Sequence, residues 1–280
     1  MIKIGFLGPK GTFSHEALEK YTAENASNYI ACEYSSFPDI LQAIQNGDIQ
    51  EGIVPIENSL EGAVNATMDT LAFDVDLKIK SEWVLAVKAN ILAKKGTELK
   101  DIKYILSHPQ PLGQCRKYLS ANFPSAEIIS VYSTAGAAQE VVEGQGDRAA
   151  IGSLAAAEVY GLEILARDIQ DNNNNFTRFV VISKEDTTRT GNDKTSIVFS
   201  TEDKPGSLYK ILDIFSLWDI NMSRIESRPA KNQLGRYIFF IDISGHKDDQ
   251  DLKDALTMVK RKSSFYKFLG SYPVYAPDRG

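Results

Sequence analysis

Cysteine and histidine are scarce in this chain of 280 residues, which has two of the first and three of the second. Cys32 and Cys115 are too few for a disulfide framework and cannot form a four-cysteine metal site. No two of His15, His108 and His246 share a spacing that is typical of metal ligands. We therefore expect no structural or catalytic metal.

An excess of positive charge is also missing. The chain has 31 Lys and Arg against 37 Asp and Glu, a formal net charge of −6. Because nucleic-acid binders need a basic surface, this balance argues against a nucleic-acid partner. No apolar run approaches the length that spans a membrane, and the N-terminus begins as a strand rather than as a signal peptide. We expect a soluble, cytoplasmic protein without a membrane partner.

What the chain does have is an alternation of short apolar strands with amphipathic helices over its first 183 residues. Such alternation predicts parallel sheets with helices on both faces. A helix over 38–46 that ends at Gly47 is typical of the segments between strands. The expected strands are residues 2–7, 30–34, 52–56, 77–87, 102–106, 127–131, 149–151 and 163–165.

A polar stretch, residues 184–193, has no large apolar residue and predicts a linker. The segments that follow it have the order strand, helix, strand, strand, helix, strand, which is the order of a ferredoxin-like domain. These segments are residues 195–200, 207–218, 223–227, 237–244, 251–262 and 265–272.

Nucleotide and thiol chemistry have little support. The glycine-rich segment at 8–12 fits neither the dinucleotide fingerprint nor the spacing of a P-loop. Cys115 follows His108 by seven residues, but no Asn or Asp is placed to complete a thiol triad, so a buried helical cysteine is the preferred interpretation. Catalysis, if present, is expected to use neither cofactor nor metal.

Small polar residues follow several of the predicted strands, at 8–14, 55–62, 107–110 and 133–136. Each group has an ordinary explanation, since Ser, Thr and Asn cap helices and stabilise each helix by about 1 kcal/mol. Together the groups also place N–H groups and hydroxyls on one rim, which suits a ligand that bears carboxylates. The second interpretation points to a small dianion or an amino-acid-like molecule.

The most unusual segment is the run of four asparagines that leads into Phe176-Thr177-Arg178-Phe179. Asparagine favours turns because its short amide can bond to the local main chain. A loop this polar before a strand this apolar would hold Thr177 and Arg178 at a sheet edge, where open α/β sheets bind ligands. The alternative is a surface loop that closes an edge strand.

Taken together, these segments resemble the prephenate dehydratase family followed by an ACT domain. The resemblance covers nearly the whole chain and looks like the monofunctional form, because the chain starts at the dehydratase strand without a chorismate mutase portion. It rests on seven motifs in the family's order: GPKGTFS at 8–14, PIENS at 55–59, SHPQ at 107–110, STA at 133–135, NFTRF at 175–179, GSLY at 206–209 and IESRP at 225–229.

The resemblance implies an α/β fold in which residues 1–183 form a catalytic domain like a type II periplasmic binding protein, with two lobes around a cleft. Lobe one would hold about residues 1–78 and 160–183, and lobe two residues 79–159. Residues 184–194 would be the linker. Residues 195–280 would form a ferredoxin-like ACT regulatory domain.

The family's reaction converts prephenate to phenylpyruvate with loss of water and CO2. By resemblance Thr177 is the catalytic residue, as a hydrogen-bond donor to the leaving hydroxyl. Arg178 would pair with a substrate carboxylate or, equally, anchor the loop to an acid. Glu57 is either a second acid or, as we prefer, part of a structural network. Phe179 is either core or a ring that dries the cleft.

Decarboxylation loses the charge of one carboxylate, so neutral donors suit that group better than several arginines would. The substrate-binding residues that the resemblance implies are Gly11, Thr12, Asn58, Ser59, Ser107, His108, Gln110, Ser133, Thr134, Arg178 and Phe179.

The ACT resemblance implies L-phenylalanine as an allosteric inhibitor and self-association as a dimer or tetramer. The motif has Ser207 and Tyr209 where Ala and Val are often found; both are tolerable beside contacts made by the backbone, and Tyr209 is expected to alter the effector affinity. The alternative for residues 225–229 is an edge strand with solvated charges. The implied effector residues are Gly206, Ser207, Leu208, Asn221, Glu226, Ser227 and Arg228.

Two other classes of function are compatible with the pattern. The chain could be a ligand sensor on a binding-protein fold, which would have no need of Thr177. It could also be an interaction protein whose ACT pair recruits a partner, which would need an exposed apolar patch. Formation of phenylpyruvate from prephenate separates both from an enzyme.

Overall fold

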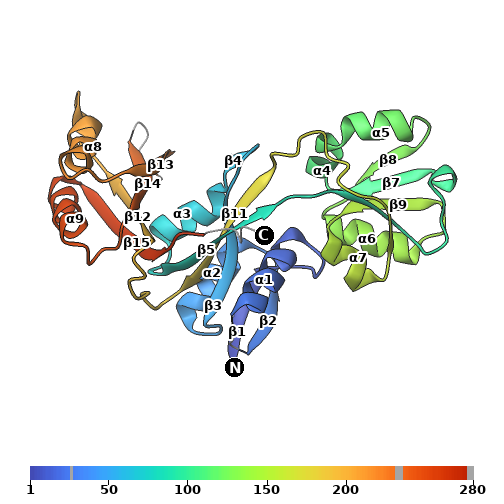
Figure 1. Cartoon of the computed structure of the whole chain (residues 1–280), viewed down its shortest axis with the longest axis horizontal. Coiled ribbons are helices and arrows are strands. Elements are labelled where there is room, and N and C mark those ends of the chain that lie inside the picture. Colours follow the sequence, from blue (N-terminus) through green and yellow to red (C-terminus); the bar gives the residue numbers. More distant parts are fainter. Residues whose placement is uncertain (26–27, 231–235, 276–280) are drawn as a thin grey trace. The chain divides into compact units, whose positions relative to one another are not determined.

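A computed structural model of the protein describes residues 1–25, 28–230 and 236–275 (Figure 1). The described residues form three sheets with helices packed on them. Two compact units divide the chain: Met1–Ile40, Ile53–Gly62 and Val84–Phe179 make the first, and Leu41–Gly52, Ala63–Trp83 and Val180–Gly280 the second. In the described ranges, no helix combines the length and the apolar character that crossing a membrane requires.

The first sheet has the strand order β2-β1-β3-β11-β5, with β4 beside β3. Strands β1 and β2 are parallel, and β3 is almost wholly buried, as expected for a strand covered on both faces. Its strands and the helices between them are β1 (Ile2–Leu7), α1 (Phe13–Glu24), β2 (Tyr29–Tyr34), α2 (Phe37–Asn46), β3 (Glu51–Asn58), β4 (Gly62–Ala63), α3 (Asn65–Phe73), β5 (Lys78–Ala86) and β11 (Phe176–Ser183).

The second sheet has the order β10-β6-β9-β7-β8. β7 is parallel to β8 and β9, but β6 is antiparallel to β9 and β10. The expectation of purely parallel sheets is therefore wrong for this sheet. Its elements are β6 (Asn90–Ala93), the 3₁₀ helix η1 (Leu99–Asp101), β7 (Tyr104–Ser107), α4 (Pro109–Gln114), α5 (Arg116–Asn122), β8 (Glu127–Ser130), α6 (Thr134–Glu143), β9 (Arg148–Gly152), α7 (Leu154–Tyr160) and β10 (Glu163–Ala166).

Two crossovers join these sheets, and both lie further along the chain than the lobe boundaries expected from the sequence. β5 continues to Ala86 in the first sheet, and β10 belongs to the second sheet. Alternating hydrophobicity marks residues as strand but does not state which sheet they join. The crossovers, residues 87–89 and 167–175, bond to each other: Val87 N donates to Asn175 O, and Ile169 N donates to Ala89 O.

The third sheet has the order β13-β14-β12-β15 and is antiparallel throughout. With two helices on one face it forms the expected ferredoxin-like domain, and the two sheets before it agree with the expected α/β class. Its core contains Phe199, Phe215 and Ile241. The elements are β12 (Asp193–Ser200), α8 (Ser207–Leu217), β13 (Met222–Pro229), β14 (Tyr237–Ser244), α9 (Gln250–Lys262) and β15 (Phe265–Pro273).

The other face of the third sheet packs on α3 and on the first part of β5, residues 78–83, which belong to the same compact unit. Arg228 on β13 makes a two-nitrogen contact with the Asp69 carboxylate on α3, at 3.2–3.3 Å. Lys267 on β15 donates to Ala72 O and Val75 O, and so binds carbonyls at the C-terminal end of α3. Burial lowers the pKa of the Lys267 ammonium, which Asp76 partly offsets.

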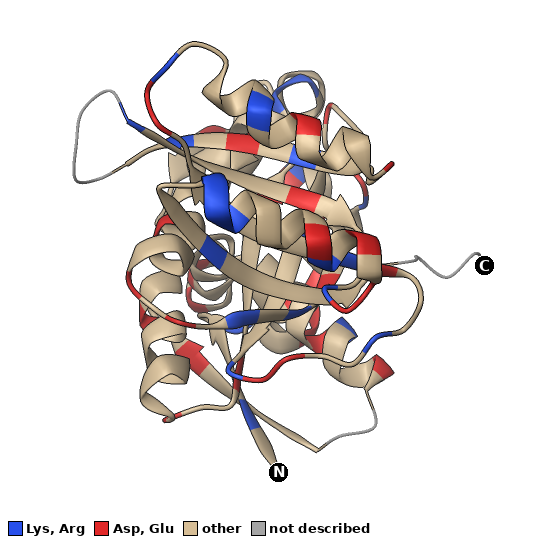
Figure 2. Ribbon diagram, turned by 90° about the vertical axis from the view of Figure 1, so that its left-hand side faces the viewer, with Lys and Arg blue, Asp and Glu red and all other residues tan. Residues whose placement is uncertain are grey.

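The backbones of β15 and β5 are in close contact at Gly270 and Ile79. A Cβ added to Gly270 would lie 2.5 Å from Ile79 O, and Gly270 has φ +138°. Nearby, Lys194 on β12 pairs with the buried Glu82 carboxylate through both oxygens, at 2.8 and 2.9 Å. Figure 2 shows that positions of Lys and Arg (blue) are interspersed with positions of Asp and Glu (red) along the ribbon. The third sheet is thus fixed to α3 and β5 by close packing and by ion pairs.

Candidate functional site

The ends of β3 and β11 bring together Asn58, Ser59 and Thr177, three of the residues predicted from the sequence. Asn58 Nδ2 lies 2.9 Å from Thr177 Oγ1 and 2.8 Å from Asn175 Oδ1. Ser59 Oγ donates to Asn174 O and accepts from Phe176 N, and Ser59 N donates to Phe176 O. Residues more than 110 positions apart in the chain therefore form one polar cluster.

The orientation of the Asn58 amide follows from its neighbours. Its Oδ1 lies 3.0 Å from Leu60 N and 3.1 Å from Glu61 N. Backbone N–H groups can only donate, so the oxygen must face them and the NH2 group must face Thr177. Thr177 Oγ1 consequently accepts from Asn58, and because no acceptor among the described residues takes its hydrogen, the hydroxyl can donate to another molecule. Thr177 is partly exposed, so this donor is accessible.

Arg178 lies on the opposite side of the same pair of strands. Successive side chains of a strand point to opposite faces, and Arg178 Nη2 lies 3.1 Å from Glu57 Oε2, while Thr177 contacts Asn58. Arg178 is 8% exposed. The contact corresponds to the anchoring role of Arg178 and to the structural role of Glu57 that the sequence allows. Phe179 is 2% exposed and belongs to the core.

Five predicted residues share one edge of the second sheet. Ser107 ends β7 and pairs with Ser130 at the end of the parallel strand β8, so the segments after both strands lie at the same edge. Ser107 is buried and donates to Ile151 O at 2.8 Å. Ser133 caps α6 by accepting from Gly136 N, at 2.9 Å. Thr134 is buried in the first turn of α6, and His108 and Gln110 belong to the start of α4.

Gly11 and Thr12 lie in the loop that precedes α1. Thr12 caps α1 by accepting from His15 N and donates to Leu7 O. Gly11 has φ +87°, and an added Cβ would lie 3.0–3.1 Å from Tyr160 and Ala156, so only glycine fits against α7. Ser153 Oγ donates to Gly11 O at 2.8 Å and also caps α7. The loop is thereby bonded to the end of β9.

Two residues of this region, the partly exposed Gln114 and the buried Ser153, were missed as site candidates. Gln114 Oε1 accepts from Asn175 Nδ2 at 2.9 Å, and the buried Ser153 hydroxyl binds Gly11. Neither has a local sequence signal, because their partners are distant in the chain. Cys115 is fully buried, as preferred from the sequence, although it lies between α4 and α5 rather than within a helix, and burial together with Asp171 raises the pKa of its thiol to about 12. In the described part of the chain, no group of three or more His, Cys, Asp or Glu side chains could hold a metal.

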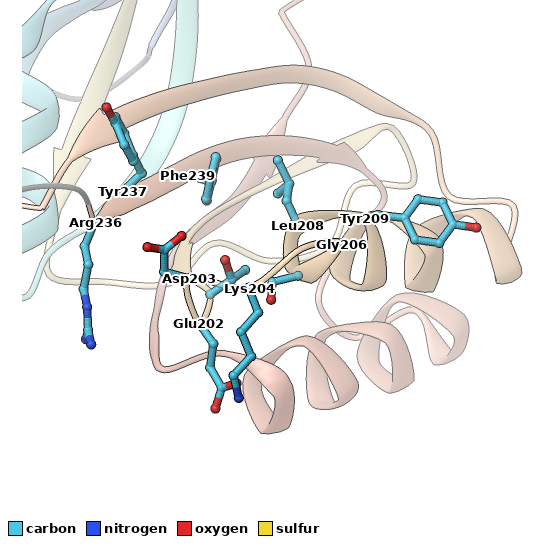
Figure 3. A pocket seen from close by; sticks show the side chains of 11 residues that line it. Glu202, Asp203, Lys204, Gly206, Leu208, Tyr209, Arg236, Tyr237 and Phe239 are labelled. Atoms are coloured by element: carbon cyan, nitrogen blue, oxygen red, sulfur yellow. The ribbon is translucent and has the colours of Figure 1, made fainter.

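A cavity of about 240 Å³ lies at the N-terminal end of α8 (Figure 3). Gly206 has φ +76° and forms the N-cap of α8. Glu202 and Lys204 form an ion pair of 2.6 Å in the loop before it, and this pair raises the pKa of Lys204. The lining residues are Thr201, Glu202, Asp203, Lys204, Gly206, Ser207, Leu208, Tyr209, Arg236, Tyr237 and Phe239.

The cavity thus includes three of the predicted effector residues, Gly206, Ser207 and Leu208. The other four do not line it. On β13, Ser227 pairs with Phe239 of the cavity lining, whereas Glu226 and Arg228 pair with Phe240 and Ile238 and face the other way. Arg228 contacts Asp69 there. Asn221 precedes β13, and its carbonyl accepts from Ser244 N.

The chain is similar to proteins of known activity over nearly its whole length. A family model described as prephenate dehydratase matches residues 4–187, and a model described as ACT domain matches residues 195–257. The chain is 42% identical to a bifunctional chorismate mutase/prephenate dehydratase of Aquifex aeolicus, over 97% of this chain and 74% of that protein. It is 38% identical to a prephenate dehydratase of Mycobacterium tuberculosis, over 98% of this chain and 87% of that protein.

Solved structures agree with this. A prephenate dehydratase of Arthrobacter aurescens, solved in complex with L-Phe, superposes with a TM-score of 0.88 at 38% identity, over 98% of this chain and 90% of that one. A protein described as a quorum-quenching acylase superposes with a TM-score of 0.86 at 29% identity, over 98% of both chains. The match of the family model to two thirds of the sequence, together with these relatives, shows that the chain belongs to the prephenate dehydratase family.

Proposed function

We propose that this protein is a prephenate dehydratase that forms phenylpyruvate in the biosynthesis of L-phenylalanine. The observation that carries the proposal is the Thr177 hydroxyl, which accepts from Asn58 and keeps its own hydrogen for a ligand. Membership of the family supports the choice of substrate. An enzyme of amino-acid biosynthesis would work in the cytoplasm, which the two free cysteines suit.

The reaction breaks two bonds of the substrate ring. The ring carboxylate leaves as CO2, its bonding electrons make the ring aromatic, and the C4 hydroxyl leaves as hydroxide, which gains a proton to become water. Thr177 would donate a hydrogen bond to this departing oxygen, where negative charge develops. The bond that Oγ1 receives from Asn58 polarises the hydroxyl and strengthens it as a donor.

The position of Arg178 fits a second requirement of this chemistry. Decarboxylation removes a negative charge, so a guanidinium held against the ring carboxylate would stabilise the substrate more than the transition state. Arg178 is paired with Glu57 on the reverse face of the strands. Neutral groups, such as the Ser133 hydroxyl and the N–H groups at the start of α6, would then bind carboxylates.

The test is ultraviolet detection of phenylpyruvate after prephenate is added to the purified protein. Thr177→Ala is expected to lower kcat by about 1,000-fold, the upper part of the range for loss of one such donor. Thr177→Ser keeps the hydroxyl and is expected to retain most of the activity. A wild-type protein that forms no phenylpyruvate would overturn the proposal, and a fully active Thr177→Ala would overturn the role of Thr177 alone.

Acyl-amide hydrolysis is a second candidate, favoured by the similarity to the acylase structure. Acyl transfer needs a nucleophile beside a base. Thr177 Oγ1 is bonded to the Asn58 amide, which does not take up protons, and the buried Cys115 thiol has a pKa of about 12. This geometry favours dehydration. Incubation with an N-acylated amine, followed by an assay for the free amine, tests the alternative.

We propose L-phenylalanine as a feedback inhibitor that binds at the α8 cavity. Backbone N–H groups at the start of α8 suit a carboxylate, and Leu208, Tyr237 and Phe239 offer an apolar surface for a phenyl ring. Ser227, on the strand pair beside Phe239, is the β13 residue best placed to contribute. Titration with L-phenylalanine should lower the rate of phenylpyruvate formation and raise Tm. Equal rates with and without it would contradict the regulation.

We also propose that two copies associate through β13. This strand is at the edge of the third sheet, and an edge strand invites pairing with another chain. Ile225 is 45% exposed on it, and Leu217 on α8 is 70% exposed. Sedimentation of the wild type should give twice the mass of one chain or four times it. Ile225→Lys should shift that mass toward a single chain.

A further inference from the structure

Asn175 differs from the three asparagines that precede it. It is 2% exposed, whereas residues 172–174 are all exposed. A buried amide needs partners for its oxygen and its NH2 group. Asn175 Oδ1 accepts from Asn58 at 2.8 Å, and Asn175 Nδ2 donates to Gln114 Oε1 at 2.9 Å. Its carbonyl accepts from Val87 N of the other crossover. The side chain of Asn175 therefore connects β3 to α4, and its backbone carbonyl connects the two crossovers.

We propose that Asn175 is a positioning residue for the reaction, which fixes the direction of the Thr177 hydroxyl through Asn58. The inference rests on the proposed function. A flipped Asn58 amide would turn its oxygen toward Thr177, and the threonine hydroxyl would then donate inward rather than to the departing oxygen. Asn175 Oδ1 opposes that flip, because it can only accept and so requires the NH2 group of Asn58 to face it.

Gln114 accepts from the other end of the Asn175 amide. Its Oε1 requires the NH2 group of Asn175, which leaves the Asn175 oxygen for Asn58. Gln114 O also accepts from Asp171 N at 2.7 Å, so the segment that carries Asn175 is held at two points. The order of donors and acceptors runs without a break from the backbone N–H groups of Leu60 and Glu61 to Gln114.

The inference is tested first by comparing Asn175→Ala with Asn173→Ala. Asn173 belongs to the same run, but it is exposed and accepts only from Gln170 in the described residues. Loss of orientation should lower kcat of Asn175→Ala about 100-fold, with KM changed by less than about threefold because the substrate-binding groups remain. Asn173→Ala should match the wild type. Asn175→Asp keeps an acceptor for Asn58 and should recover part of the lost kcat.

A double-mutant cycle with Thr177 separates positioning from a general structural role. If Asn175 acts through Thr177, then Asn175→Ala should cost little when Thr177 is already Ala. Independent, additive losses in the two variants would overturn the inference while the wild-type activity upholds the proposed function. A wild type that forms no phenylpyruvate would overturn both. Reduced active enzyme at unchanged kcat per active site would also contradict positioning.

Discussion

Two short strand segments of this protein carry an arginine next to a residue expected to bind a small molecule, and the arginines have different uses. On β11, Arg178 is paired with Glu57 on the neighbouring strand, directly behind Thr177. On β13, Arg228 is paired with Asp69 of α3, behind Ser227. The first pair stabilises the strands that hold the candidate site. The second joins the third sheet to α3, a helix that begins seven residues after Asn58 in the chain.

The comparison shows that neighbouring residues of one strand motif serve different purposes, because they lie on opposite faces of the sheet. Thr177 and Arg178 are neighbours in sequence but contact opposite sides of the sheet, as do Ser227 and Arg228. A bound effector that shifts β13 would act on α3 through the contact of Arg228 with Asp69. Arg178 pairs with Glu57 of the neighbouring strand β3 instead. Substitutions of Arg178, Arg228 and Ser227 can test these separate roles.

Gly270→Ala should have the largest effect, because it separates the third sheet from β5 and removes the basis of the Arg228 contact. The added Cβ meets Ile79 O and also disfavours φ +138°, so we expect a loss of about 3 kcal/mol from overpacking and backbone strain combined. Thermal unfolding measures it. Gly191→Ala is the matched control, since Gly191 has φ +91° with no atom near the added Cβ; an equal loss there would refute the packing explanation.

Arg178→Met should come next. It leaves the Glu57 carboxylate without this partner, and because Glu57 is partly exposed we expect about 2 kcal/mol rather than the larger cost of a fully buried pair. Tm should fall by about 4–8 °C for a protein of this size. KM for prephenate should stay within about threefold of the wild type if Arg178 does not bind substrate. A large rise in KM with an unchanged Tm would instead indicate that Arg178 binds the substrate.

Asp69→Asn and Arg228→Met should have smaller effects on stability, about 1 kcal/mol each, since the pair is partly exposed. Both should weaken inhibition by L-phenylalanine about tenfold, the typical size of an allosteric coupling. Basal kcat should be retained. Calorimetric titration of L-phenylalanine separates lost coupling from lost binding: if both variants are inhibited like the wild type, the α3 contact does not transmit.

Ser227→Ala should have the smallest effect. The residue is exposed, so Tm should change by less than about 1 °C. If its hydroxyl binds the effector, the inhibition constant for L-phenylalanine should rise by about threefold to tenfold, the range for one hydrogen bond. An inhibition constant equal to that of the wild type would remove Ser227 from the effector site.

Much of the fold could be predicted because its signals are local. The helix expected at 38–46 and the order of strands and helices along residues 195–272 follow from periodicity and turn residues. The antiparallel strand β6 was missed, since Asn90–Ala93 is a short, fully buried run without alternation. The lobe boundaries of the structure differ from the expected ones for a related reason. The hydrophobic pattern of a strand does not specify the strands with which it pairs.

The candidate site could be predicted only in part. Asn58, Ser59 and Thr177 are brought together as the motifs suggested. Many of the other hydroxyls already bind backbone: Thr12 to Leu7 O, Ser107 to Ile151 O. Whether a polar residue faces a ligand or the main chain depends on partners distant in sequence. Alternation alone, however, could have placed Arg178 on the face away from Thr177.

The attachment of the third sheet to α3 and β5 has a consequence for dissecting the protein. The family models divide the chain near residue 190, but the compact unit that contains the third sheet also takes in Ala63–Trp83. A cut in the linker would therefore pass through one packed body and leave Glu82 without Lys194 and the end of α3 without Lys267. The boundary between the two family models therefore differs from the boundary between the two compact units of the structure.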